Sequence, residues 1–310
     1  GTNTARLLIA DVDKTGLLRP VLYRRAITRL GGGYLESKGI DPGAAERAFE
    51  ALKGFQAAIS TSAAEKVFSV ATSVVRRAKN KDWFLREAYK RAGLKITVIT
   101  GGEEARMTLL GVLSVLDDSR RKKLVMDVGG GSTEFIATSG DDMAGEWSME
   151  MGVVHLTEKY LKSDPPEKEE LCRLESEINT VIGGLRERMM IGGVDPAGYT
   201  AGGDAVFVGT AGTITTLAAL DKGLEVYDRN KINNHTIGKE RLREIYAFLT
   251  SLTLKEREAV LSIEKGREDL IIPGTAVAIL AMEAFGFEEL KVSDAGLLEG
   301  VILANVSALP

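Results

Sequence analysis

Apolar and polar positions along the chain follow two periods, one typical of strands and one typical of helices. Short apolar runs rich in β-branched residues predict strands. Strands are expected at residues 5–12, 21–32, 66–72, 95–100, 144–151 and 289–294, with a strand–turn–strand unit over 123–138. A strand that leads through a glycine turn into a helix is expected over 204–220.

Apolar residues repeated every three or four positions predict the helices between these strands. Asp41 followed by Pro42 is a typical helix start, and that helix is expected to run to about residue 59. Further helices are expected at residues 81–91, 101–115, 167–190, 238–250, 254–261, 266–286 and 295–306. Because strands and helices interleave along the chain, the predicted fold class is α/β.

Three turns combine glycine with hydroxyl-bearing residues: Gly1–Thr4, Gly129–Thr133 and Gly209–Thr213. Backbone N–H groups in such turns can point inward together and bind an anion, and the third turn also opens a helix. Phosphate is the natural ligand, although glycine turns without any ligand are common. The candidate phosphate-binding residues are Thr2, Asn3, Gly129, Gly130, Gly131, Ser132, Gly209, Thr210, Gly212 and Thr213.

Two acids flank the second turn, which reads VMDVGGGSTEF over residues 125–135. Asp127 precedes the glycines and Glu134 follows them. A carboxylate beside bound phosphate needs a cation between them, so the pair predicts a Mg²⁺ site. A dinucleotide-binding fingerprint is excluded because its last glycine position holds Glu134 and a strand follows instead of a helix. The Walker pattern for nucleotide phosphates is also absent.

Composition limits the remaining possibilities. The chain has 310 residues, of which 44% are hydrophobic and 27% charged, with a net charge of −4. Without a long basic block, nonspecific binding to nucleic acid is not expected. Cys172 alone cannot form a disulfide framework. His155 and His235 are too few for a zinc triad, so both histidines are expected to be structural or to lie at the rim of the site. No apolar run is long enough to span a membrane, and a cytoplasmic location is expected.

The motif VMDVGGGSTEF resembles the second phosphate motif of the exopolyphosphatase / guanosine pentaphosphate phosphohydrolase family, within the actin, sugar-kinase and heat-shock ATPase superfamily. Other segments follow in family order: GTNTARLLIADV, ATSVVRRAKN, VITGGEEARMTLLGVL, GTAGTITTLAAL, GREDLIIPG and VSDAGLLEG. The resemblance implies two ribonuclease-H-like domains with a cleft between them. Their expected bounds are 1–118 with 291–310, and 123–290.

The resemblance also implies two catalytic residues. A glutamate in the GEEAR segment orients the attacking water in the family, and the matching residue is Glu104. The residues alone do not decide between Glu104 and its neighbour Glu103. Arg76 matches a family arginine and is expected to bind phosphate oxygens. Arg77 is its competitor, because successive residues on a strand face opposite ways.

The implied reaction is Mg²⁺-dependent hydrolysis of a terminal phosphoanhydride bond, in inorganic polyphosphate or in guanosine pentaphosphate. An ATP-dependent small-molecule kinase and a non-catalytic alarmone or polyphosphate sensor are the alternatives. The sequence departs from the family pattern in two places. In the family, an acidic residue of the first domain lies on the strand just before the GTNT segment, ahead of the position of Gly1. Ala295 and Leu298 stand where relatives often carry basic residues. Family members are often dimers, so a homodimer is also expected.

Overall fold

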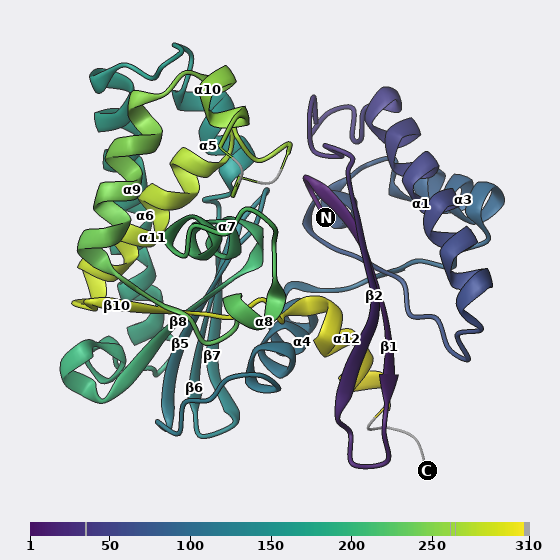
Figure 1. Ribbon diagram of the computed structural model, residues 1–310, viewed down its shortest axis with the longest axis horizontal. Helices are drawn as coiled ribbons and strands as arrows, with labels where there is room; N and C mark the ends of the chain where they lie inside the picture. The colour runs from purple at the N-terminus through teal and green to yellow at the C-terminus, as the bar shows by residue number, and fades with distance from the viewer. Residues whose placement is uncertain (35, 261, 264, 307–310) are drawn as a thin grey trace. The chain divides into compact units, whose positions relative to one another are not determined.

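The computed structural model describes residues 1–34, 36–260, 262–263 and 265–306. The chain divides into two compact units, shown in Figure 1. Unit 1 comprises Gly1–Gly111 and the chain from Leu297 onward, and unit 2 comprises Val112–Gly296. The assignment of ribonuclease-H-like domains to the ranges expected from the sequence remains a prediction.

The strands of unit 1 form two separate pairs. β1 (Thr4–Val12) and β2 (Leu18–Ile27) form an antiparallel hairpin with a register shift between Ile9 and Ala10. β3 (Val70–Ala71) and β4 (Thr97–Val98) form a short parallel pair. All but β1 are shorter than the sequence predicts. Residues 66–68 are exposed and lie outside β3. β2 ends where a turn begins, with the Gly32 N–H donating to the Arg29 carbonyl.

Five helices complete the described part of unit 1: α1 (Pro42–Ser62), α2 (Ser73–Arg77), α3 (Lys81–Ala92), α4 (Gly101–Leu113, whose last residues pass into unit 2) and α12 (Leu297–Val306). Asp41 caps α1 by accepting a hydrogen bond from the Ala44 N–H at 2.9 Å, as its sequence predicts. The core between α1 and α3 contains Phe49 stacked on Phe84, with ring centroids 5.2 Å apart. The predicted strand position of Arg76 and Arg77 is wrong, because both lie in α2.

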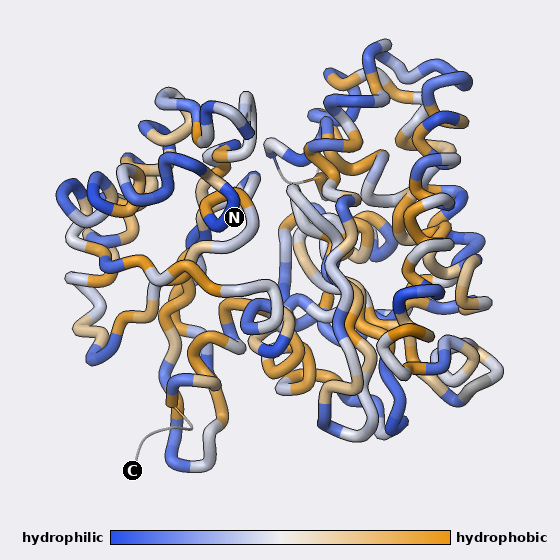
Figure 2. The backbone as a smooth tube through the Cα atoms, turned by 180° about the vertical axis from the view of Figure 1, so that it is seen from behind, coloured by the Kyte–Doolittle hydropathy of each residue, from blue (hydrophilic) through white to orange (hydrophobic). Residues whose placement is uncertain are grey.

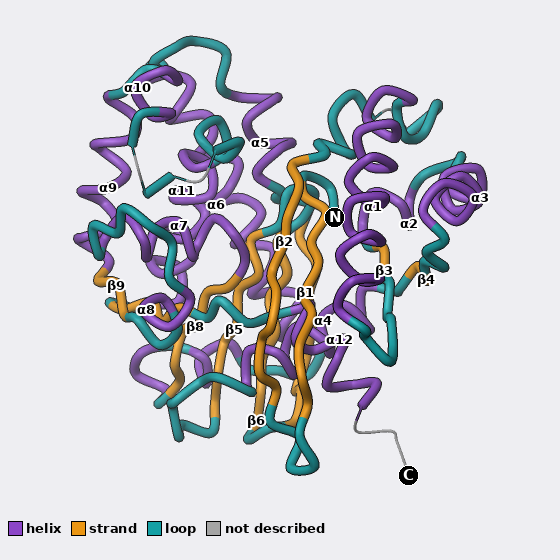
Figure 3. The backbone as a smooth tube through the Cα atoms, turned by 45° about the vertical axis from the view of Figure 1, so that its right-hand side comes forward, coloured by secondary structure: helices purple, strands orange, loops and turns teal. Residues whose placement is uncertain are grey.

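Unit 2 contains a six-stranded mixed sheet in the order β7-β6-β5-β8-β10-β9. Figure 3 labels β5, β6, β8 and β9 of this sheet. Its strands are β5 (Lys122–Val128), β6 (Thr133–Ser139), β7 (Asp142–Met149), β8 (Ala205–Thr210), β9 (Thr236–Gly238) and β10 (Glu289–Val292). β5, β8 and β10 are parallel, so their carboxyl ends reach the same edge of the sheet. The predicted hairpin over 123–138 is confirmed, with β5 antiparallel to β6. Lys291 and Val292 pair with β8 and so belong to this sheet.

The helices of unit 2 are α5 (Val153–Tyr160), α6 (Lys168–Ile191), α7 (Ala211–Asp221), α8 (Arg229–Ile232), α9 (Lys239–Ser251), α10 (Leu254–Glu258) and α11 (Ile271–Phe285), with 3₁₀ turns at Pro196–Tyr199 and Ala201–Gly203. α11 is buried along most of its length and lies alongside α6 and α9 (Figure 1). α6 alternates between hydrophobic and hydrophilic residues, as expected of a helix with one exposed face (Figure 2). None of the described helices is both long and apolar enough to cross a membrane.

The apolar helix predicted over 266–286 begins five residues late, at Ile271. Residues 266–270 form turns instead, and the Leu270 N–H donates to the Arg267 carbonyl at 2.9 Å. Gly266 has φ +85°, which lies in the left-handed region and is incompatible with a right-handed helix. A structured loop therefore precedes α11.

Candidate phosphate-binding and catalytic site

Four polar residues form one row across neighbouring strands of the unit 2 sheet. Asp127 on β5 pairs with Glu134 on β6 and with Thr210 on β8, and Glu134 pairs in turn with Ser148 on β7. Directly paired residues project to the same face of a sheet. The two acids predicted from the sequence therefore lie side by side, at the edge where β5 and β8 end.

Glu134 is held in place by two hydroxyl groups. Its Oε1 accepts hydrogen bonds from Ser132 Oγ at 2.6 Å and from Ser148 Oγ at 2.9 Å, and only 9% of the residue is exposed. Among the described residues, no group of three or more acidic, histidine or cysteine side chains could hold a metal ion. Two carboxylates suit Mg²⁺, which is bound by few protein ligands and takes its other ligands from water and phosphate. The donor set therefore fits Mg²⁺ held partly by a bound substrate.

The turn over 129–132 lies against the start of α5. The N–H groups of Val153 and Val154 donate to the carbonyls of Gly129 and Gly130, at 3.1 and 3.0 Å. In a trans peptide the C=O and the following N–H point in opposite directions. The N–H groups of Gly130 and Gly131 therefore point away from α5, toward a common side. Neither donates a hydrogen bond to another described residue, so the turn presents two adjacent donors, as an anion site requires.

The close approach between this turn and α5 explains one further glycine. A Cβ on Gly152 would lie 2.2 Å from the carbonyl carbon of Gly131 and 2.5 Å from the carbonyl oxygen of Gly130. Only glycine therefore fits at position 152. Gly152 could not be predicted from its local sequence, because no local pattern shows that residues about twenty positions apart have backbones in contact.

Several residues of the turn over 209–213 contact other parts of the protein. A Cβ on Gly209 would lie 2.8 Å from Ile214 Cγ2, so core packing is enough to require glycine there. The Thr210 hydroxyl donates to the Ala295 carbonyl at 3.1 Å and is buried. The Thr213 side chain packs against Gly274 on α11, where an added Cβ would lie 2.2 Å from its Cγ2. The Thr210 hydroxyl therefore already has an acceptor within the protein, and phosphate binding by Thr210 and Thr213 stays a prediction.

Arg267 is not among the site residues predicted from the sequence, although it lies in the family segment GREDLIIPG. Its guanidinium lies directly against Gly212 in the first turn of α7, where a Cβ would be only 1.7 Å from Arg267 Nη1. A helix N-terminus already favours negative charge, and a guanidinium adds bidentate donors for phosphate. The guanidinium of a residue more than fifty positions later in the chain thus lies beside the GTAGT turn.

The first predicted turn, in unit 1, is tied to the end of β2. The Asn3 carbonyl accepts hydrogen bonds from the N–H groups of Thr28 and Arg29, at 3.0 and 2.8 Å. The Thr2 carbonyl accepts one from the Gly31 N–H at 2.7 Å. Asn3 is buried, and its side-chain Oδ1 has no hydrogen-bond partner among the described residues. The carbonyls of Thr2 and Asn3 thus fix the turn, and their role with phosphate stays a prediction.

The structure distinguishes the two neighbouring glutamates at the start of α4. Glu103 Oε2 accepts from both the N–H and the hydroxyl of Thr100, at 2.8 Å each, and these bonds lower the pKa of Glu103. Glu103 therefore caps the helix. Glu104 Oε2 lies 3.1 Å from Arg76 Nη1, and the two side chains are 15% and 29% exposed.

Arg76 is anchored from the other side as well. Its Nη1 also donates to the Ile99 carbonyl at 2.9 Å, at the end of the segment that leads into α4. Arg76 thus fixes the carboxylate of Glu104, while its Nη2 makes no hydrogen bond to another described residue. The two predicted catalytic residues are in contact, and they came from different sequence motifs.

A family model described as the Ppx/GppA phosphatase family matches residues 8–308. The chain belongs to this family. The family assignment agrees with the resemblance seen in the sequence motifs. The chain is also 33% identical to a protein named Exopolyphosphatase 2 from Mycobacterium tuberculosis, over 98% of this chain and 96% of that one.

Solved structures of the Ppx/GppA family share the fold. A Ppx/GppA enzyme from Aquifex aeolicus is 31% identical, with a TM-score of 0.78 over 98% of this chain and 96% of that chain. An exopolyphosphatase from Cytophaga hutchinsonii matches all of this chain and 96% of its own, with a TM-score of 0.88 at 24% identity. The latter likeness bears on the fold alone. The predicted α/β, actin-like fold is confirmed.

Three other residues considered in the sequence lie outside this site. His155 and Cys172 are exposed on α5 and α6. His235 Nε2 lies 2.6 Å from Asp221 Oδ2, in a half-buried pair between the residue before β9 and the last residue of α7. None contacts the row of Asp127 and Glu134 through a hydrogen bond or ion pair that joins described residues.

Proposed function

We propose that this protein hydrolyses the terminal phosphoanhydride bond of a linear polyphosphate. The observation that carries the proposal is the turn over 129–132, whose two adjacent amides stand beside the paired carboxylates Asp127 and Glu134. Amides suit phosphate and carboxylates suit a hard cation, so both kinds of donor at one sheet edge suit a phosphate–metal complex.

Different residues of the chain bind the phosphates and orient the attacking water. Gly130 and Gly131 donate to oxygens of the terminal phosphoryl group, and Arg267 with the α7 N-terminus donates to a further phosphate. Glu104 orients a water for in-line attack and accepts its proton, and Arg76 holds that carboxylate in place through their contact. Mg²⁺ on Asp127 and Glu134 would neutralise phosphate charge. That these groups act on one phosphoryl group is what the family resemblance predicts.

The names of relatives support inorganic polyphosphate as the substrate. Exopolyphosphatase 2 of Mycobacterium tuberculosis aligns over nearly the whole chain. Guanosine pentaphosphate is the second candidate, because the family resemblance seen in the sequence motifs implies either substrate. The two differ in the group that follows the reacting phosphates, which is more phosphate in one and a nucleoside in the other.

The decisive experiment measures phosphate release, with and without Mg²⁺, from long-chain polyphosphate and from guanosine pentaphosphate. Glu104→Gln should lower the rate by roughly 100-fold or more, because a general base contributes about 10²–10⁴. Binding of polyphosphate should remain. Glu103→Gln is the matched control: it removes a neighbouring charge whose visible role is to cap α4, and it should retain most of the activity. Equal loss in both variants would remove Glu104 from the proposed role.

The same assays address the alternatives. Phosphoryl transfer from ATP to a small acceptor, without hydrolysis of polyphosphate, would indicate a kinase. Tight binding of polyphosphate or guanosine pentaphosphate without turnover would indicate a sensor. The expected homodimer, the cytoplasmic location and the lack of nucleic-acid binding stay predictions, and sedimentation of the pure protein tests the first of them.

A further inference from the structure

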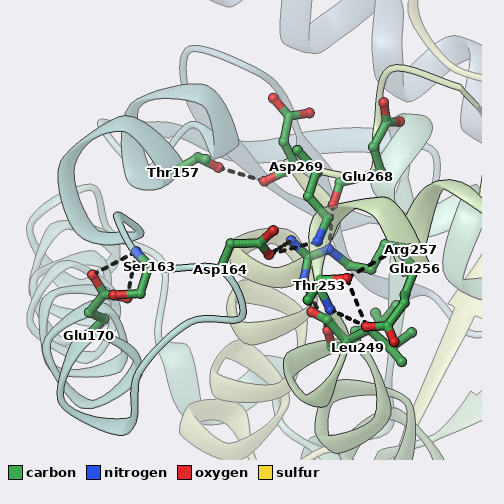
Figure 4. Close-up of polar contacts among 12 residues, drawn as sticks. Thr157, Ser163, Asp164, Glu170, Leu249, Thr253, Glu256, Arg257, Glu268 and Asp269 are labelled. Carbon is green, nitrogen blue, oxygen red and sulfur yellow. Dashed lines mark hydrogen bonds and ion pairs between the residues drawn. The ribbon is translucent and has the colours of Figure 1, made fainter.

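Arg257 on α10 is a buried arginine whose donors converge on backbone carbonyls (Figure 4). Only 5% of the residue is exposed. Its Nε donates to the Glu268 carbonyl at 2.9 Å, and its Nη1 donates to the carbonyls of Leu249 and Leu252 at 3.3 and 2.5 Å. The nearest carboxylate atom is Asp164 Oδ1, 3.8 Å from Nη2. The guanidinium therefore joins the end of α9 and the loop over 266–270.

The two residues that follow Arg267 in this loop are both held through their backbone carbonyls. Arg257 holds the carbonyl of Glu268, and Thr157 Oγ1 on α5 donates to the carbonyl of Asp269 at 3.1 Å. Glu268 Oε2 in turn accepts from the Gly266 N–H. The backbone on either side of Arg267 is thus restrained by side chains, although the loop belongs to no helix or strand.

We propose that Arg257 is a positioning residue that acts through Arg267. By fixing the carbonyl next to Arg267, it holds that guanidinium against Gly212 at the N-terminus of α7. A loop free to shift by about 1 Å would misplace the donors for phosphate, and such shifts can cost about 100-fold in rate. This inference rests on the proposed function in one respect, the binding of phosphate by Arg267. The hydrogen bond from Arg257 to the Glu268 carbonyl is observed within unit 2 and does not depend on that function.

The shape of the guanidinium is what this role requires. A planar fork can donate from Nε toward one segment and from Nη1 toward another, in fixed directions. A lysine at position 257 keeps the positive charge near Asp164 but has one nitrogen and no fork. Arg257→Lys should therefore loosen the loop with less disturbance of the core than Arg257→Ala, which would leave three carbonyls without their donor.

A double-mutant cycle tests whether Arg257 acts through Arg267. In the wild-type background, Arg257→Lys should lower kcat/KM for polyphosphate roughly tenfold. In an Arg267→Ala background, the same change should lower it by less than about twofold, because the group being positioned is gone. A purely structural role would give the same loss in both backgrounds, and that result would overturn the proposal. Arg186→Lys is the matched control, since Arg186 donates to the Ala284 carbonyl far from the loop.

A second measurement does not depend on activity. Arg257→Lys should speed amide hydrogen exchange of peptides covering 265–270 and leave peptides from the sheet strands β5 and β6 unchanged. Thr157→Val, which removes only the second tether, should produce a smaller change in the same peptides and keeps the test open if Arg257→Lys does not fold. Unchanged exchange in the loop of both variants would overturn the inference. A wild-type protein with no phosphatase activity would overturn the proposed function instead, and the exchange result would still stand.

Discussion

The glycine turns at 129–132 and 209–213 have similar compositions and end adjacent strands of one sheet, yet different groups approach them. In the first turn the backbone at Gly152 lies on one side and orients the amides toward the other. In the second turn the side chain of Ile214 lies against Gly209, and the guanidinium of Arg267 lies against Gly212. One turn is shaped by main chain and the other by side chains.

The comparison shows how far a glycine turn alone can indicate function. Glycine reports that something lies close to the backbone, but a side chain, a second backbone and a ligand all impose the same requirement. The first turn keeps its donors available because its neighbour uses only the carbonyls. The second turn has the guanidinium of Arg267 beside it. The two sites should therefore respond differently to the same kind of substitution.

The largest effect is expected from Gly152→Ala. An added Cβ would meet the backbone of Gly130 and Gly131, which cannot move without turning their amides. We expect phosphate release to fall about 100-fold from the displaced donors and stability to fall by about 1–3 kcal/mol from overpacking. Steady-state kinetics and urea denaturation measure the two losses separately.

Gly183→Ala is the control for this variant. Gly183 is exposed within α6, and a Cβ there would have no atom within 4 Å beyond its own helix. It should raise stability by up to about 1 kcal/mol, since alanine favours helices, and leave activity unchanged. If Gly152→Ala also retains full activity, the amides of the first turn do not bind the substrate.

A smaller effect is expected where the carboxylate row meets the first turn. Ser148→Ala removes one of the two hydroxyls that hold Glu134 Oε1. Loss of such an outer hydrogen bond typically weakens metal binding by about 10–100-fold. The Mg²⁺ concentration for half-maximal phosphate release should rise at least about tenfold, while the rate at saturating Mg²⁺ changes little. Ser139→Ala, at the exposed end of the neighbouring strand, should leave this concentration unchanged.

Much of this arrangement could be predicted from the sequence, and the part that could not depends on distant contacts. Alternating residues around GGG fix the hairpin and place Asp127 opposite Glu134, because a short turn leaves one register. Asp41 and Pro42 likewise fix the start of α1. Local pattern could not show that residues 266–270 are a loop carrying Arg267, since their apolar continuation into α11 is typical of a helix.

The same limit applies to the second turn and to α2. The need for glycine at 209 arises from Ile214 and from Leu290, and the latter lies some eighty residues away. Arg76 lies in the short helix α2, which the local spacing of apolar residues does not predict. The expectation that Arg76 and Arg77 face opposite ways on a strand was therefore wrong. Family motifs still brought Arg76 and Glu104 into one hypothesis, and they lie in contact.

Gly209→Ala tests whether the second turn requires glycine for packing and not for phosphate binding. Its Cβ would meet the ends of Ile214 and Leu290, at 2.8 and 3.0 Å, and those side chains can shift more easily than backbone. We expect a loss of about 1–3 kcal/mol in the free energy of unfolding. The kcat/KM of the folded protein should change by less than about threefold, because the donors at Gly212 and Arg267 are not displaced. A loss as large as that of Gly152→Ala would show that both turns orient amides for the substrate.

The smallest effect is expected from Thr213→Val, which decides whether the second turn uses its hydroxyls at all. The Thr213 side chain packs on Gly274 and is 4% exposed, and valine keeps both the branched shape and the methyl contact. A hydrogen bond to a charged group is typically worth about 1.5–3 kcal/mol, so a phosphate contact through this hydroxyl would cost roughly tenfold or more in KM when removed. We expect a change below about threefold in KM for polyphosphate, measured beside wild type at the same ionic strength. A tenfold rise in KM would support the predicted role of the Thr213 hydroxyl in phosphate binding. The two turns would then differ only in the contacts made by Gly209 and Thr210.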